Sequence, residues 1–424
     1  MQVRTDPRIF TGNSCGRSIT MTAINDMSIK TPDFSEPARC DASTDRHRLA
    51  IILYSIVVGL YWMAQYVYAA TLPSYVQSKT STLTSVGMVL SMYGLCQALV
   101  RLPVGICTDW IGWRKPFILA GLTFTGIGAW LLGTAHTVDG LVLGRAVTGV
   151  AAGAWVPMVV AFSSLFPPKD SIRAAGFLIL LQASGRVLAS AANGPLNLLG
   201  GYRLAFYVAV GISVVALLFA LMIREPRRPS TRPSGRMIGR LIIRRDVLLP
   251  SLLAGLSQAI TWGVSLSFIP IVAKQVGGTD NTQSVLAMLA VVTLAAGSLS
   301  MNVITKRIGP RRVVTLSLAL MASGCVIAAL AESVPRLIAS QICLGLGLGF
   351  AYPGLMGLSI RNVIDRERTI AMGLHQTLYA MGMFVGPAVS GALAQAVGIH
   401  WMFATTGLVS LALGYWGAHS LATE

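Results

Sequence analysis

The chain contains twelve long apolar segments, and this feature limits its possible folds more than any other. Segments such as residues 49–70, 116–135 and 313–331 are nearly free of charge. With a rise of about 1.5 Å per residue, a helix of about 20 residues crosses about 30 Å of hydrocarbon. The other segments are residues 83–104, 140–163, 174–197, 203–223, 247–272, 282–303, 335–360, 371–394 and 398–418. We therefore predict an all-α integral membrane protein with twelve transmembrane helices.

Composition and charge support this prediction. Hydrophobic residues make up 54% of the chain and charged residues 12%, against about 25% charged in soluble domains. The net charge of +17 comes from lysines and arginines that lie mostly on one side of the twelve-helix arrangement. By the positive-inside rule, this side is the cytoplasm, and both termini lie there. The asymmetry accounts for the basic charge without a nucleic-acid partner.

Other segments and residue types narrow the possibilities further. Residues 1–48 are polar and lack the apolar core of a signal peptide, so we expect a cytoplasmic, disordered tail. The six cysteines show no metal-ligand spacing and imply no disulfide framework, and no metal site is expected. The chain lacks a Gly-x4-Gly-Lys-Ser/Thr loop and, at the membrane faces, paired carboxylates, so neither internal ATP hydrolysis nor an enzyme is expected.

The chain also repeats itself. A shift of 197 positions places Gly176 and Gly185 on Gly373 and Gly382, and it superimposes the six apolar segments of each half within a few residues. This predicts two parallel six-helix halves, residues 49–223 and 247–420, joined by the basic linker of residues 224–246.

Two motifs carry a resemblance to a known family. Between the second and third apolar segments, two glycines, an aspartate and a basic pair occur at fixed spacing; they are Gly105, Asp109, Gly112, Arg114 and Lys115. In the fourth segment, Arg145 and Gly149 stand four residues apart. In these motifs the sequence resembles the major facilitator superfamily of secondary transporters. The resemblance implies the twelve-helix fold of that family and makes the loop motif a conformational latch between the halves.

A third motif is displaced. In the family's antiporters a glycine-rich pattern lies in the fifth helix, but here the better copy lies in residues 371–394, as Gly373, Gly382, Gly386, Pro387 and Gly391. The displacement weakens an antiporter assignment. Small residues at four-residue spacing also serve close helix packing in membranes, so this set is a helix-packing motif in its simplest interpretation.

Arg145 and Arg186 are the candidate binding residues with the clearest physical signal. Arg186 lies about 12 residues from either end of its segment, too deep for its side chain to reach the headgroups. Such a charge costs about 2.5 to 3.5 kcal/mol to insert and marks functional sites. No Asp or Glu lies at mid-membrane in the twelve-helix model. A cavity with positive potential would suit an anion, although backbone carbonyls near Pro157 or Pro195 could instead accept these charges.

Polar and aromatic faces extend the expected substrate cavity, which comprises Tyr61, Gln65, Arg145, Arg186, Gln258, Trp262 and Tyr379. His375 is a candidate for proton coupling, and a structural, hydrogen-bonded histidine is the alternative. No cofactor is expected beyond a coupling ion, H⁺, which follows from the family resemblance alone.

These observations favour a secondary active transporter of the cytoplasmic (inner) membrane that works as a monomer by alternating access. Its partners would be a small organic solute and the lipid bilayer. Proton-coupled export of a drug or metabolite is the first expectation. Uptake or exchange of an organic anion bound by Arg145 and Arg186 is the alternative, and a transporter-like membrane sensor is a distant one.

Overall fold

The computed structural model describes residues 38–167, 170–225, 244–364 and 368–420, and within these ranges the secondary structure is entirely helical. Residues up to Asp45 form one unit and Arg46–Glu424 another, and the bundle described below is the second unit. The helix α1 begins at Ala38, so the expectation of a disordered tail does not hold for residues 38–48. Residues 1–37 and most of the predicted linker, residues 226–243, lie outside the described part.

The first half of the chain supplies six membrane spans. Its elements are α1 (Ala38–Tyr66), α2 (Leu72–Gln77), α3 (Leu83–Ile111), α4 (Lys115–Thr134), α5 (Val138–Ala151), η1 (Ala152–Ala154), α6 (Trp155–Ser163) and α7 (Ser171–Met222). With 52 residues, α7 is too long for one crossing, and its helical backbone breaks at Gly200 and Gly201. Gly201 has a φ of 66°, which favours glycine. The break divides α7 into the fifth and sixth spans.

The second half repeats this arrangement. Its elements are α9 (Arg245–Ile260), η3 (Thr261–Phe268), α10 (Ile269–Gln275), α11 (Asp280–Ile308), α12 (Pro310–Ala329), α13 (Val334–Ile360), α14 (Arg368–Val397) and α15 (Ile399–Ser420). The seventh span runs through α9, η3 and α10, and its middle part, η3, is a π-helix of eight residues. Long π-helical segments are rare and often mark functional sites.

The number of spans agrees with the prediction. In the described residues, ten helices have the length and apolar character to cross a membrane, and α7 is one of them. Division of α7 and addition of α15, which has 22 residues, bring the bundle to twelve spans. Two predicted bounds differ clearly from the structure: α1 begins at Ala38 and not at residue 49, and α3 ends at Ile111 and not near residue 104.

Apolar side chains cover the outside of the bundle, where lipid would contact them. Leu199 and Leu299 are more than 80% exposed, at 81% and 83%. A surface with this many exposed apolar side chains requires an apolar surround. The prediction of an integral membrane protein is confirmed by these helices together with their fold.

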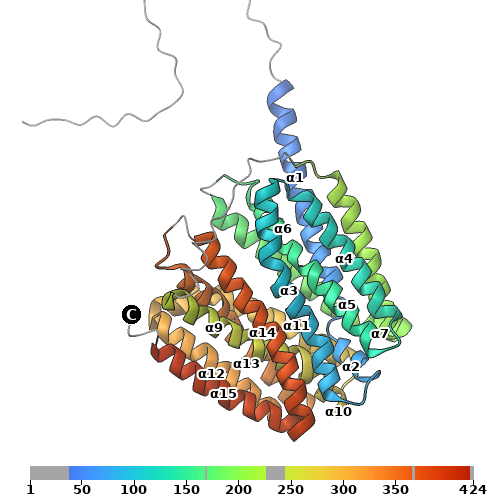
Figure 1. The fold of residues 1–424 in the computed structure, drawn as a ribbon, viewed down its shortest axis with the longest axis vertical. Coiled ribbons are helices and arrows are strands. Elements are labelled where there is room, and N and C mark those ends of the chain that lie inside the picture. Colours follow the sequence, from blue (N-terminus) through green and yellow to red (C-terminus); the bar gives the residue numbers. More distant parts are fainter. Residues whose placement is uncertain (1–37, 168–169, 226–243, 365–367, 421–424) are drawn as a thin grey trace, which may run out of the picture. The chain divides into compact units, whose positions relative to one another are not determined.

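The two halves meet along two pairs of helices: α3 packs against α14, and α7 packs against α11 (Figure 1). Glycines permit the close approach. A Cβ added to Gly391 in α14 would lie 2.9 Å from the Cα of Gly87 in α3. Within the second half, a Cβ on Gly382 or Gly386 would overlap the backbone of α9. These three members of the glycine motif therefore lie at helix contacts.

The two ends of the bundle can be told apart by the elements that begin and finish there. We call the end where α7 finishes and α9 begins, at Met222 and Arg245, the linker end. The opposite end, where α1 finishes at Tyr66 and α10 finishes at Gln275, is the turn end.

Candidate functional site

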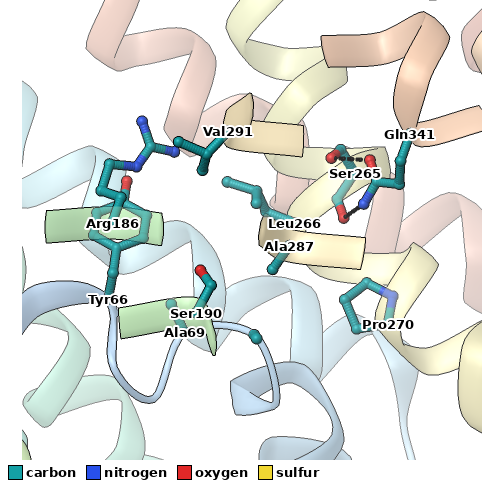
Figure 2. Close-up of a pocket in the computed structure, with 11 residues that line it drawn as sticks. Tyr66, Ala69, Arg186, Ser190, Ser265, Leu266, Pro270, Ala287, Val291 and Gln341 are labelled. Atoms are coloured by element: carbon teal, nitrogen blue, oxygen red, sulfur yellow. Dashed lines mark hydrogen bonds between the residues drawn. The ribbon is translucent and has the colours of Figure 1, made fainter. Parts of the chain in front are cut away.

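A narrow pocket lies where the halves face each other, and both halves line it (Figure 2). From the first half come Tyr66, Ala69, Ala70, Arg186 and Ser190, and from the second Ser265, Leu266, Pro270, Ala287, Val291 and Gln341. Its polar groups stand on opposite sides, with Arg186 on one side and the Ser265–Gln341 pair on the other. A charged side chain and a hydrogen-bonded pair from different halves therefore face each other across the pocket.

The arginine on this pocket rests on an aromatic ring. The guanidinium carbon of Arg186 lies 4.4 Å from the centroid of the Tyr66 ring. A cation over a ring face is stabilised by about 0.5 to 2 kcal/mol, which offsets part of the cost of burial. Among the described residues, the buried Nε of Arg186 has no hydrogen-bond partner. The prediction that Arg186 lies at a polar cavity fits this placement.

Across the pocket, two side chains form a reciprocal contact. The Ser265 hydroxyl donates to Oε1 of Gln341 at 2.6 Å, and Nε2 of Gln341 donates to the Ser265 carbonyl oxygen at 3.3 Å. Ser265 belongs to the π-helix η3, in which the Ser267 hydroxyl also donates to the backbone carbonyl of Trp262 at 2.6 Å. Of these two hydroxyls, that of Ser265 lies on the pocket, whereas that of Ser267 bonds to the backbone of its own helix.

Arg145 takes part in a second stack that crosses between the halves. Its guanidinium carbon lies 4.7 Å from the ring centroid of Tyr93 on α3. The Tyr93 ring stacks on Trp262 of η3, with centroids 5.1 Å apart and planes 14° apart. Arg145 is 5% exposed, and its Nε has no hydrogen-bond partner among the described residues. A buried charge in the first half is therefore linked through two rings to the π-helix of the second.

Two other predicted cavity residues are held within the first half. The Tyr61 hydroxyl donates to the Ala151 carbonyl oxygen at 3.1 Å, and Gln65 Nε2 lies 3.5 Å from both the Tyr61 hydroxyl and the Thr148 carbonyl oxygen. Both side chains are buried, and neither lines the pocket of Figure 2. They join α1 to α5 and so position the helices that carry Tyr66 and Arg145.

The remaining predicted residues lie in the second half and do not line the pocket. Gln258 is 2% exposed in α9. The Tyr379 ring on α14 lies 5.3 Å from the Tyr352 ring on α13. His375, one turn before Tyr379, is completely buried, and its Nδ1 lies 3.1 Å from the Ser251 hydroxyl. In the described part of the chain its Nε2 has no partner.

The motif expected as a loop is largely helical. Gly105 and Asp109 lie in the last turns of α3, and the turn begins only at Gly112, which has a φ of 67°. The helix continues because nothing before Gly112 requires a left-handed backbone. The predicted latch residues therefore share one helix end and the turn that follows it.

The basic pair of this motif contacts the end of α7. The backbone N–H groups of Arg114 and Lys115 donate to Oε2 of Glu225 at 3.2 and 2.7 Å, and the Arg114 guanidinium lies 3.9 Å from the same carboxylate. Lys115 Nζ also donates to the carbonyl oxygens of Leu221 and Ile223. Among the described residues, Arg114 forms its ion pair with Glu225 and none with Asp109. The sequence offered one signal for this: Glu225 is an acid in a basic segment.

Arg101 and Tyr93 are the site residues that sequence reasoning missed. Arg101 lies about ten residues before Ile111, so it is buried well inside α3. Sequence reasoning left Arg101 within the predicted span of residues 83–104 but singled out only Arg145 and Arg186. The depth argument used for Arg186 extends to Arg101, because α3 continues to Ile111 and the end of the helix therefore lies farther away.

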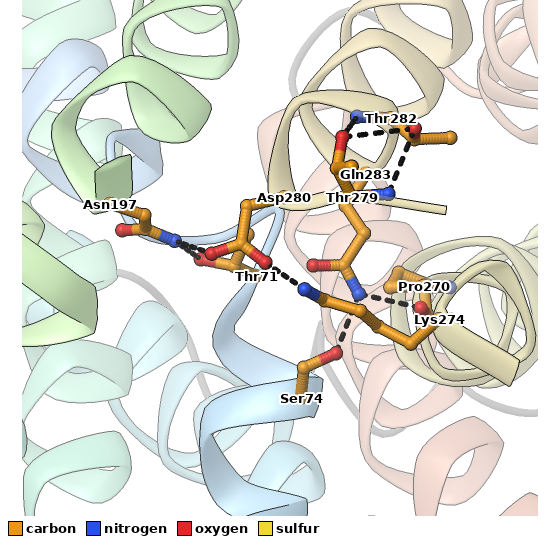
Figure 3. A network of polar contacts seen from close by, with 9 residues as sticks. All are labelled: Thr71, Ser74, Asn197, Pro270, Lys274, Thr279, Asp280, Thr282 and Gln283. Atoms are coloured by element: carbon orange, nitrogen blue, oxygen red, sulfur yellow. Dashed lines mark hydrogen bonds and ion pairs between the residues drawn. The ribbon is translucent and has the colours of Figure 1, made fainter. Parts of the chain in front are cut away.

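At the turn end, a network of polar contacts joins the halves (Figure 3). Asn197 Nδ2 donates to the Thr71 hydroxyl at 2.9 Å and to Oδ2 of Asp280 at 3.0 Å. The other carboxylate oxygen of Asp280 pairs with Lys274. Nearby, Gln283 Nε2 donates to the Ser74 hydroxyl at 2.6 Å. These contacts join the two halves at the turn end.

The chain was compared with protein families, curated proteins and solved structures. Residues 54–257 and 251–419 match the model described as Major Facilitator Superfamily. An uncharacterised MFS-type transporter of Methanocaldococcus jannaschii is 19% identical over 80% of this chain and 90% of its own. A class H tetracycline resistance protein of Pasteurella multocida is 22% identical over 73% of this chain and 79% of its own. A bacterial homologue of the human lysosomal transporter Spinster, solved in an inward-facing, unoccupied conformation, shares the fold, with a TM-score of 0.72, 16% identity and coverage of 92% and 98%.

Proposed function

The chain belongs to the Major Facilitator Superfamily and is a multi-pass membrane transporter, and from this premise we propose that it exports a small organic drug or metabolite in exchange for protons. In this proposal the protein works as a monomer in the cytoplasmic (inner) membrane, with both termini in the cytoplasm. The pocket of Figure 2 carries the proposal, because a site lined by both halves can be exposed to either side as the halves rock. The tetracycline resistance relative favours export.

A second candidate function is uptake or exchange of an organic anion. Three arginines lie inside the described spans at positions 101, 145 and 186, and no described carboxylate lies at mid-span with them. Each guanidinium has an Nε without a hydrogen-bond partner among the described residues. Guanidiniums in a medium of low dielectric attract a counter-ion strongly, and a bound anionic solute would supply it.

Transport into inverted membrane vesicles tests both candidates. Vesicles with the protein are offered cationic, neutral and anionic aromatic solutes, with and without an imposed pH gradient. For export we expect uptake above that of vesicles without the protein, and faster uptake when the vesicle interior is acidic. Replacement Arg186→Ala should lower it at least about tenfold, since loss of one charged hydrogen bond costs about 1.5 to 3 kcal/mol. Arg203→Ala is the control, because this exposed arginine at the start of the sixth span does not line the pocket.

The outcomes separate the candidates. Uptake no faster than in empty vesicles for every solute would refute transport of these classes, and preference for cations would refute the organic-anion candidate. His375 is our candidate for the proton-coupling residue, because it is buried and only one of its ring nitrogens is bonded among the described residues. In the same vesicles, His375→Gln should leave solute exchange intact and remove the response to the pH gradient.

A further inference from the structure

Arg101 is a buried arginine whose charge the described protein groups do not neutralise. It is 7% exposed, and its Nη1 donates to Oε1 of Gln376 at 2.9 Å. Its Nε has no partner among the described residues, and one turn earlier the buried Oε1 of Gln97 has none either. Its depth in α3 prevents the guanidinium from reaching either end of the helix.

The acceptor that holds Arg101 is neutral. A hydrogen bond from a guanidinium to a carboxylate is about twice as strong as a bond between neutral groups. Two parallel N–H groups of the guanidinium can also bind the two oxygens of the carboxylate. An amide carbonyl offers one oxygen and no charge. Gln376 therefore orients Arg101 without satisfying it, and an acidic group that reached this position would be the stronger partner.

The same bond joins the two halves of the bundle. Arg101 belongs to α3 of the first half and Gln376 to α14 of the second. The bond between Arg101 and Gln376 lies nearer the linker end. The other side-chain hydrogen bonds that the described residues form between the halves involve residues at the turn end. The neighbouring contact is loose: a Cβ on Gly373 would lie 3.5 Å from Cδ1 of Leu102, an ordinary van der Waals distance.

Arg101 also lies near the pocket side of the second half. The Tyr379 ring, one turn after Gln376 on α14, has both Arg101 and Arg186 as electrostatic neighbours. An anion that enters between the halves would thus meet the field of two guanidiniums.

We propose that Arg101 is a specificity-determining residue that binds the acidic group of an organic anion in place of the Gln376 amide, and that this exchange releases α14 from α3 towards the linker end. The inference rests on the proposed function in one respect, namely that a solute enters the space between the halves. It goes further by assigning the substrate class, an organic carboxylate or sulfonate, and by coupling that charge to separation of the halves.

Ligand-induced thermal stabilisation of the purified full-length protein in detergent tests the proposal without a need for transport. The probes are 1-naphthoate and its neutral counterpart 1-naphthamide, which differ mainly in charge. We expect wild-type protein to bind naphthoate at least about tenfold more tightly than naphthamide, which corresponds to about 1.4 kcal/mol. Arg101→Gln should remove this preference, and Arg101→Lys, which keeps the charge, should keep part of it.

Gln376→Glu is the sharpest variant. Its carboxylate should occupy Arg101 permanently, so the protein should fold at least as well as wild type but lose the preference for naphthoate. Gln395→Glu is the matched control, because Gln395 lies on the same helix and accepts a hydrogen bond from the backbone N–H of Leu83 at 2.8 Å, without a guanidinium. It should keep the wild-type preference.

The proposal is overturned if wild-type protein binds the two probes alike, or if Arg101→Gln or Gln376→Glu keeps the preference. A charge preference that depends on Arg101, in a protein that moves no solute in vesicles, would refute the proposed transport and support this inference. If the protein transports solutes and these substitutions leave its preference between the probes unchanged, the proposed transport is supported and this inference is refuted.

Discussion

The turn end and the linker end of the bundle join the two halves in different ways. At the turn end, Asn197 binds Asp280, Gln283 binds Ser74, and the backbone of Leu83 binds Gln395. Towards the linker end, the described residues provide the bond between Arg101 and Gln376. The packing of α3 against α14 differs between the ends in the same way. At the turn end Gly391 lies in close contact with the backbone of α3, whereas Gly373 leaves room for a Cβ beside Leu102.

This difference indicates which end opens more easily in the conformation seen here. Several bonds in parallel, supported by close backbone contact, must break together before the turn end can separate. Towards the linker end, the Arg101 bond stands alone among those formed by the described residues, and one competing group can replace it. A mechanism of alternating access needs this kind of asymmetry in each state, because one end must hold while the other yields.

Substitution of the glycine at the turn-end contact between α3 and α14 should have the largest effect on transport. In Gly391→Val, the new side chain would collide with the backbone of Gly87 and the Leu83 carbonyl, and overpacking of about 3 kcal/mol corresponds to about a hundredfold loss of transport rate. Gly373→Val, at the loose contact of the same helix, should change the rate by less than about twofold. Vesicle uptake at equal protein level measures both. Equal losses in the two variants would show that the ends are not packed differently.

Loss of the ion pair in the turn-end network should have the second largest effect on transport. Asp280→Ala leaves Lys274 without its ion-pair partner and removes the acceptor of Asn197. Since the pair is partly exposed, we expect a loss of about 1 to 2 kcal/mol, seen as about a tenfold slower transport and a lower unfolding temperature. Asp139→Ala is the control, since Asp139 also lies in the first turn of a helix at this end but is exposed. An unchanged rate in Asp280→Ala would mean that the network does not hold the halves together.

The contact of Glu225 should have the smallest effect of the three, because it lies within the first half and does not join the halves. Glu225→Gln keeps one acceptor for the backbone N–H groups of Arg114 and Lys115 and loses the charge. We expect about 1 kcal/mol of destabilisation and less than about a threefold change in transport rate. Glu332→Gln, in an exposed pair with Arg336, should shift the unfolding temperature much less. A large transport defect in Glu225→Gln would show that this contact controls the halves after all.

Sequence reasoning located the spans well and the contacts between them poorly. The helices were recognisable because apolar length is a local property, and the break at Gly200 and Gly201 fell between two predicted spans. The end of α3 was missed, because the polar residues Thr108 and Asp109 resemble a loop although the helix continues to Ile111. The longer helix places Arg101 deeper in its span than the predicted bounds did. The segment of Arg186 was predicted with nearly correct bounds, and Arg186 lies on the pocket that both halves line.

What the sequence by itself determined was the membrane-spanning fold and its two-fold repeat. In hydrocarbon each backbone polar group must be satisfied within its own helix, so local apolar length is sufficient to predict spans. Only the tertiary structure decided which polar groups meet. Arg101 and Gln376 stand 275 residues apart, and the stack of Arg145, Tyr93 and Trp262 draws on three spans. Such contacts depend on the rotation and close approach of packed helices, which no single segment encodes.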